Sequence, residues 1–203
     1  GTTAFDIINQ DIVRYYGVGP YWEGRGFPDY EGIPVLKFDP RRKIIADWRL
    51  DGGYWVVSNR TRELLEKLDG DAFDFRPTIS SQGKNPVPGG PFWLCDVIRV
   101  LDAVDEERSE LYMGQTQTVD GTLINRRYQS IHLARFRPEI VGEAHVFDLA
   151  RNSMAVVDDI FVEAITKAKI TGIAFCDLQS IDRANRRRRH YSLPPLSRPE
   201  QGA

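Results

Sequence analysis

The apolar residues of this chain come in short runs that glycine, proline or charged residues interrupt, and no run reaches seven residues. A helix that crosses a bilayer needs about 20 apolar residues, so we predict no membrane span. Hydrophobic residues make up 41% of the 203 residues, which is typical of a globular protein. A chain of this length buries enough surface to fold without a disulfide or a metal ion.

Two segments have the pattern of a helix. The first spans residues 59–68, where Ser58 supplies an N-cap oxygen and leucines recur at helical spacing. The second spans residues 159–168 and is capped by Asp158 or Asp159, because acidic residues suit the positive end of a helix. Its buried face is predicted to hold Phe161, Ala164, Ile165 and Ala168.

Aromatic and β-branched runs predict at least seven short strands. Pro34 places the first of them at a sheet edge, because proline lacks the N–H that a central strand donates. The predicted strands are residues 33–39, 54–57, 72–76, 92–101, 123–124, 128–136, 145–149 and 173–178. Strands that outnumber the helices without alternating with them predict a β-rich α+β fold, with mixed or antiparallel sheets and two or more short helices.

Composition divides the chain into three parts. Residues 1–45 are rich in aromatic residues, glycine and proline, and we expect this segment to cover part of the core. Residues 46–182 carry the predicted α+β domain. Within it, the loop at 80–91 either separates two subdomains or connects a long hairpin. Residues 183–203 hold six arginines and one glutamate and are predicted to form a flexible basic tail.

The charge is unevenly distributed along the chain. The net charge is -2, but the tail at 183–203 carries +5 and residues 1–182 therefore carry -7. An acidic body repels phosphate, which argues against nucleic acid as a partner, and it attracts a basic protein. The arginines at 186–189 either contact phosphates or belong to a solvated tail.

Cys95 and Cys176 each lie in an apolar run, where cysteine acts as a small hydrophobic residue. Two isolated cysteines do not make a disulfide scaffold, so a reducing environment is the simplest interpretation. No basic and apolar leader opens the sequence. We therefore expect a cytoplasmic protein, and the sequence leaves its oligomeric state open.

Five acidic residues lie close together after the predicted strand at 92–101. This stretch lacks the glycine and the alternate spacing of a calcium loop, so we predict no metal site there. A solvated turn is the simplest interpretation, and Asp102, Asp105 and Ser109 suit a structural role in which side chains bond to backbone N–H groups. The candidates for a partner-binding surface are Asp102, Asp105, Glu106, Glu107 and Glu110.

The sequence displays no catalytic constellation. His132 and His145 lack the spacing of a zinc site, and no Gly-x-Ser-x-Gly elbow is present. Gly17-Val18-Gly19 precedes a proline rather than a helix, so it is not a dinucleotide-binding loop. We therefore predict no catalytic residue, no cofactor and no metal. Whether the chain is an enzyme stays open, with a binding protein favoured.

Three blocks of sequence follow one another in the order of a known bacterial family. The first holds Trp55-Val56-Val57-Ser58, the helix with Leu64-Leu65-Glu66, and residues 75–79; the second holds residues 92–98 and 101–110; the third holds residues 145–149, the capped helix and residues 170–175. Over residues 45–178 the chain resembles immunity proteins of polymorphic toxin systems, a family formerly known as a domain of unknown function. The most specific parts are the block with Asp102, Asp105, Ser109 and Glu110 and the Ile-Thr-Gly-Ile-x-Phe ending.

The resemblance implies a non-catalytic protein that binds a cognate toxin domain and neutralises it. An acidic body is compatible with a basic toxin, such as a nuclease, because carboxylates speed association with a basic surface. Two other classes stay open. One is a small hydrolase or transferase with an unrecognised site near His132 or His145, and the other is an adaptor that acts through its arginine tail.

Overall fold

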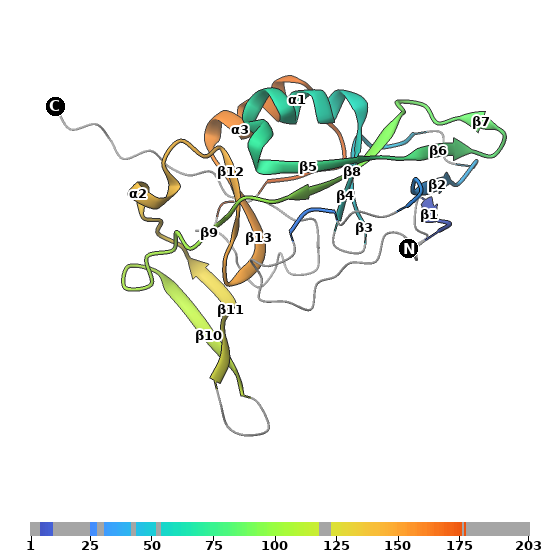
Figure 1. Ribbon diagram of the computed structural model, residues 1–203. Helices are drawn as coiled ribbons and strands as arrows, with labels where there is room; N and C mark the ends of the chain where they lie inside the picture. The colour runs from blue at the N-terminus through green and yellow to red at the C-terminus, as the bar shows by residue number, and fades with distance from the viewer. Residues whose placement is uncertain are drawn as a thin grey trace.

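The structure of the chain is a computed structural model. It describes residues 5–9, 25–27, 31–41, 44–51, 54–117, 123–175 and 177. Within these residues, four β-sheets and three α-helices confirm the predicted β-rich α+β class (Figure 1). None of the helices in the described part of the chain is long and apolar enough to cross a bilayer.

A four-stranded sheet lies at the centre and is buried on both faces. Its strands are β3 (Trp48–Asp51), β4 (Tyr54–Ser58), β8 (Phe92–Val97) and β5 (Phe73–Pro77), and neighbouring strands are antiparallel. Because side chains alternate along a strand, Trp55 and Val57 pack into one core cluster while Val56 packs into another. Cys95 belongs to the first cluster and is fully buried, as expected for a small hydrophobic residue.

Two helices cover the first face of this sheet. They are α1 (Asn59–Asp69) and α3 (Asp159–Lys167), and both N-caps follow the prediction: the Ser58 side chain accepts the N–H of Thr61, and Asp158 accepts that of Phe161 at 2.9 Å. α1 continues into a single 3-10 turn, η2 (Gly70–Ala72). The buried side chains that form the helical side of this core include Leu65, Phe161 and Ile165.

A small sheet packs on the opposite face of the central sheet. Its strands are β1 (Phe5–Ile7), β2 (Val35–Phe38), β6 (Ile79–Gln82) and β7 (Asn85–Pro86). The predicted edge position of the strand after Pro34 is wrong, because β2 lies between β1 and β6 and Pro34 precedes its first residue. Residues 79–86, at the start of the predicted loop, form a short hairpin of β6 and β7.

A third region contains β9 (Val100–Leu101), β12 (Val146–Leu149) and β13 (Asn152–Val157) in one sheet, and α2 (Pro138–Val141). Beside it, β10 (Glu110–Gln117) and β11 (Leu123–Leu133) pair with each other as a two-stranded ribbon that extends away from the other elements (Figure 1). Phe147 and Leu149 of β12 point into a core cluster under the base of this ribbon, whereas Val146 points into the cluster below the helices.

Some local predictions differ from the structure. Residues 173–175 form no strand, although Ile173 and Phe175 pack against the helical core as their apolar character suggests. The predicted strand at 92–101 breaks into β8 and β9, because the N–H groups of Ile98 and Arg99 both donate to the carbonyl of Ala72. The following features of the sequence lie outside the described residues: Tyr15, Tyr16, Tyr21, Trp22, Cys176 and the basic tail at 183–203.

Candidate functional site

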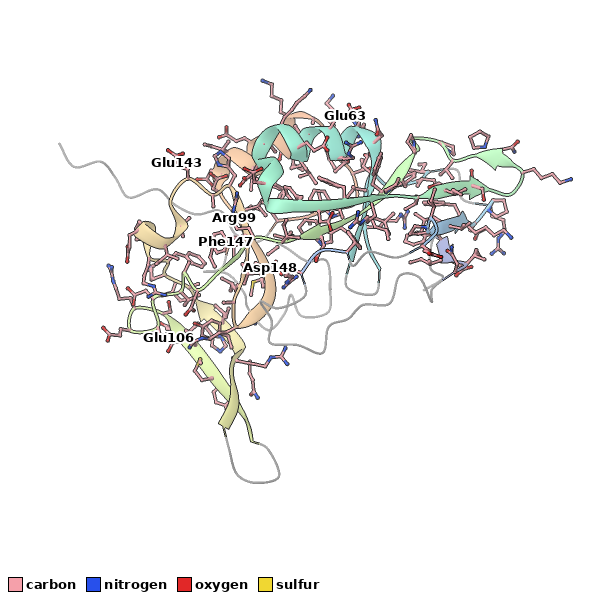
Figure 2. The ribbon with its side chains drawn as sticks, viewed as in Figure 1. Glu63, Arg99, Glu106, Glu143, Phe147 and Asp148 are labelled. Atoms are coloured by element: carbon pink, nitrogen blue, oxygen red, sulfur yellow. The ribbon has the colours of Figure 1, made fainter. Side chains whose placement is uncertain are left out.

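The acidic stretch, residues 102–110, forms the turn between β9 and β10 at the base of the ribbon (Figure 2). Two backbone contacts fix this turn against the end of β11. Val104 pairs with Phe136 in an isolated bridge, and the N–H of Asp105 donates to the carbonyl of Arg135 at 2.8 Å. The turn is therefore anchored to the core rather than carried on a free loop.

Arginines neutralise three of the five predicted partner-binding acids. Arg151 reaches Glu106 at 2.5 Å and Asp102 at 3.4 Å, so one guanidinium ties two carboxylates together. Asp105 accepts the backbone N–H of Arg108 at 3.2 Å and lies 3.9 Å from its guanidinium. These three side chains are thus engaged within the chain, and the stretch is less negative in three dimensions than its sequence indicates.

Two further contacts stiffen this turn. The hydroxyl of Tyr128 donates to Glu106 at 3.1 Å, and burial together with the negative charge of Glu106 raises the pKa of this tyrosine well above its ordinary value. The Ser109 hydroxyl accepts the N–H of Arg135 at 2.8 Å and donates to its carbonyl at 3.3 Å. Ser109 thus makes the kind of side-chain bond to the backbone that the structural interpretation expects.

Glu107 and Glu110 differ from the other three acids of the stretch in their pairing. Both are exposed, and within the described residues neither has an ion-pair partner. Tyr112, two residues beyond Glu110 on the same strand, is 62% exposed. β10 therefore exposes a carboxylate at Glu110 and an aromatic ring at Tyr112 near its first residues.

A second cluster of carboxylates is buried, and none of its residues was predicted as a site. Asp96 of β8 and Asp148 of β12 are only 6% and 4% exposed. The guanidinium of Arg25 lies between them, 3.5 Å from Asp96 and in direct contact with Asp148. One arginine from the N-terminal segment therefore bridges two different sheets.

The backbone beside Arg25 supplies two more hydrogen bonds to this cluster. The N–H of Gly26 donates to Asp96 at 2.8 Å, and the N–H of Phe27 donates to Asp74 of β5 at 2.7 Å. Phe27 itself is buried in the core between the central and the small sheet, which places one residue of the predicted covering segment in the core. We call residues 25–27 the strap.

Burial changes the acidity of these groups. Burial raises the pKa of Asp148 to about 7, against the opposing charge of Arg25 and with a contribution from the negative charge of Asp96. The pKa of Asp96 is also raised by burial, although the N–H of Gly26 and the charge of Arg25 lower it. Both effects follow from the cost of a charge in a low-dielectric interior.

The two histidines considered as possible catalytic bases, His132 and His145, contact different side chains. His145 lies 2.7 Å from Asp158, but this carboxylate also caps α3 through the N–H of Phe161, so the pair is part of the helix terminus. His132 is exposed, with Ser130 at 3.5 Å as its hydrogen-bond neighbour. Among the described residues, no three His, Cys, Asp or Glu side chains are grouped to hold a metal ion.

One sequence signal identifies the buried cluster in retrospect. Asp148 lies in β12, where all four residues are buried, and Asp96 lies in β8, where its neighbours are apolar. A carboxylate in such a strand needs a partner. The sequence gives no indication that Arg25 is that partner, because it is 71 residues from Asp96 and 123 residues from Asp148.

Comparison with known protein families gives one match for this chain. The sequence model of the immunity protein family Imm11 matches residues 7–180. The matched range includes the strap, the acidic stretch and every buried residue of the three core clusters except Phe5. It extends the resemblance noted over residues 45–178 toward the N-terminus. A comparison with curated protein sequences gives no match.

Proposed function

Because this chain belongs to the Imm11 immunity protein family, we propose that it binds a cognate toxin domain of a polymorphic toxin system and neutralises it by stoichiometric binding. On this proposal the protein acts in the bacterial cytoplasm and carries out no reaction of its own. The family match over residues 7–180 is the observation that supports the proposal most strongly.

The charge of the chain supports a basic toxin as the partner. Residues 1–182 carry a net charge of -7, and such a field speeds encounter with a positively charged surface. A toxin that acts on nucleic acid has a surface of this kind, since it must bind phosphate. We therefore propose that the toxin binds nucleic acid and that this chain does not.

The acidic stretch is the contact surface that we propose. Glu107 and Glu110 offer carboxylates that no arginine within the described residues neutralises, and Tyr112 offers an exposed ring on the same strand as Glu110. Tyrosine is enriched among the residues that dominate binding energy at interfaces. Asp102, Asp105 and Glu106 belong to the same surface, where their contacts with Arg151 and Arg108 hold the turn in shape.

A rescue experiment tests the function. A candidate toxin domain, taken from any polymorphic-toxin gene next to this one, is expressed in a bacterial host with and without this protein, and surviving colonies are counted. We expect survival with the protein and a complex that co-purifies. Killing that continues while both proteins are folded and expressed contradicts the proposal for that toxin.

Charge reversal tests the surface separately from the function. In Glu107→Lys/Glu110→Lys we expect association with the toxin to slow by roughly tenfold and its salt dependence to weaken, because long-range attraction is lost. The matched control is Glu143→Lys/Glu163→Lys, which makes the same change in net charge at two other exposed positions. Equal slowing in both double variants assigns the effect to net charge and removes this surface from the proposal.

A further inference from the structure

The strap meets the core at a point where three carboxylates come together. Asp74 and Asp96 lie directly opposite each other on β5 and β8. Asp148 belongs to β12 in another sheet (Figure 2) and shares Arg25 with Asp96. Arg25 contacts Asp96 and Asp148, and the N–H groups of Gly26 and Phe27 donate to Asp96 and Asp74. Every residue of the strap therefore makes a polar contact with this cluster.

Charged side chains of β5, β8, β12 and the strap meet at this cluster. β5 contributes Asp74 and Arg76, whose guanidinium lies 3.9 Å from Asp74 and donates to the carbonyl of Phe27 at 2.9 Å. β8 contributes Asp96, β12 contributes Asp148, and the strap contributes Arg25. Among the described residues, three carboxylates and two guanidinium groups meet here, so the charge of the carboxylates contributes to the attachment of the strap.

We propose that the strap is an acid-released latch. While Asp96 and Asp148 are ionised, the guanidinium of Arg25 joins the central sheet to β12 and holds residues 25–27 on the core. When these carboxylates take up protons, Arg25 loses the attraction of these two buried charges, and the local opening that detaches Arg25 and Gly26 becomes more frequent. Phe27 remains the apolar anchor from which the strap closes again.

The energetics of buried charges support this switch. The side chains of Arg25, Asp96 and Asp148 are 12%, 7% and 6% exposed, so water screens their attraction little. Burial raises the pKa of both carboxylates, and that of Asp148 to about 7, so a proton competes with Arg25 for Asp148 near neutral pH. A buried arginine whose partner becomes neutral keeps its own desolvation cost, which favours its return to water.

Hydrogen exchange of two amides measures the latch directly. The N–H groups of Gly26 and Phe27 are protected by Asp96 and Asp74 while the strap is attached. After correction for the intrinsic exchange rate, we expect the protection of Gly26 to fall about tenfold or more between about pH 8 and pH 5.5. Amides of the β4–β8 ladder should keep their protection and so exclude global unfolding.

The chain contains a matched internal control. The N–H of Thr171 also donates to a carboxylate that an arginine holds, the pair of Asp47 and Arg60. The pKa of Asp47 lies well below its ordinary value, because hydrogen bonds from Arg60, Thr171 and Ser58 outweigh the effect of burial. Protection of the Thr171 amide should therefore stay constant over the same pH range.

A variant of Asp148 tests whether protonation of this carboxylate controls the latch. In Asp148→Asn we expect weaker protection of Gly26 at about pH 8 and a flatter pH dependence, because one counter-charge of Arg25 is already absent. The wild-type pH series tests the proposal even if this variant folds poorly. Equal protection of Gly26 at both pH values, or a fall that Thr171 shares, would overturn the latch.

Discussion

Asp74 and Asp96 lie directly opposite each other in the antiparallel pair of β5 and β8. Like charges in this position destabilise a sheet. Here each carboxylate accepts a backbone N–H from the strap, at 2.7 Å for Asp74 and 2.8 Å for Asp96. A segment more than 45 residues away in sequence thus offsets a repulsion built into the central sheet.

The first prediction concerns the pH dependence of stability. The pKa of Asp148 is raised from 3.8 to about 7, so the native state holds this proton more tightly than the unfolded chain does. Its contribution to the free energy of unfolding is complete below pH 3.8 and is lost as the pH rises through about 7. Asp148→Asn should remove this loss, which amounts to at most about 4 kcal/mol.

Denaturant unfolding at several pH values between about 4 and 8 measures this difference. The control is Asp159→Asn, which removes an exposed carboxyl in the first turn of α3. The control should follow the wild-type slope. An Asp148→Asn profile parallel to wild type would show that Asp148 titrates at its ordinary pKa.

The second prediction concerns the glycine of the strap. Gly26 has φ +84°, and a Cβ atom there would lie 2.9 Å from the carboxylate of Asp74 and 3.3 Å from the side chain of Ile98. Gly26→Ala should therefore cost backbone strain of about 1–3 kcal/mol and displace the half-buried carboxylate of Asp74 in addition. Gly89 has φ +80° with no atom within 4 Å of such a Cβ. Gly89→Ala therefore measures the cost of backbone strain without a side-chain clash.

Thermal and denaturant unfolding of the two alanine variants separate these effects. Gly26→Ala should be the less stable of the two, because the added methyl group meets Asp74 and Ile98. Equal losses of stability in both variants would mean that Asp74 and Ile98 move aside without cost.

The third prediction concerns Asp47, which joins the first residues of the central sheet to the segment after α3. Its carboxylate accepts hydrogen bonds from Ser58, Arg60 and Thr171. Because the pKa of Asp47 is lowered, its contribution is present above the ordinary value of 3.8 and is lost as the pH falls below it. Asp47→Ala should reduce the free energy of unfolding by about 2 kcal/mol at neutral pH.

The same comparison at low pH gives the control for Asp47. At a pH below its lowered pKa, wild type and Asp47→Ala should approach equal stability, apart from the contacts of the lost side chain. A difference that is constant from neutral to strongly acidic pH would mean that the ion pair with Arg60 contributes nothing.

Local signals in the sequence predicted local structure well. Ser58 and Asp158 mark the starts of α1 and α3, because a capping oxygen needs only the next three residues. Tyr54–Ser58 and Phe73–Pro77 form strands where aromatic and β-branched residues predicted them. The errors are of another kind: the position of β2 inside its sheet and the absent strand at 173–175 depend on which segments become neighbours in space.

The site residues show the same limit. The sequence identified five acidic residues but not that Arg151, 45 residues beyond Glu106, neutralises two of them. It likewise gave no reason to connect Arg25 with Asp148. Ion pairs between distant segments leave no periodic pattern in the sequence. The net charge of a surface can therefore be derived only after the fold is known.

Neutralisation of a toxin by stoichiometric binding has a signature that can be measured with purified proteins. Isothermal titration of the purified toxin domain with this protein, together with residual toxin activity at each addition, tests it most directly. We predict saturable binding at a fixed molar ratio, with toxin activity that falls in proportion to the complex formed. Absence of binding between the two folded proteins, or complete loss of toxin activity far below that ratio, would contradict the account.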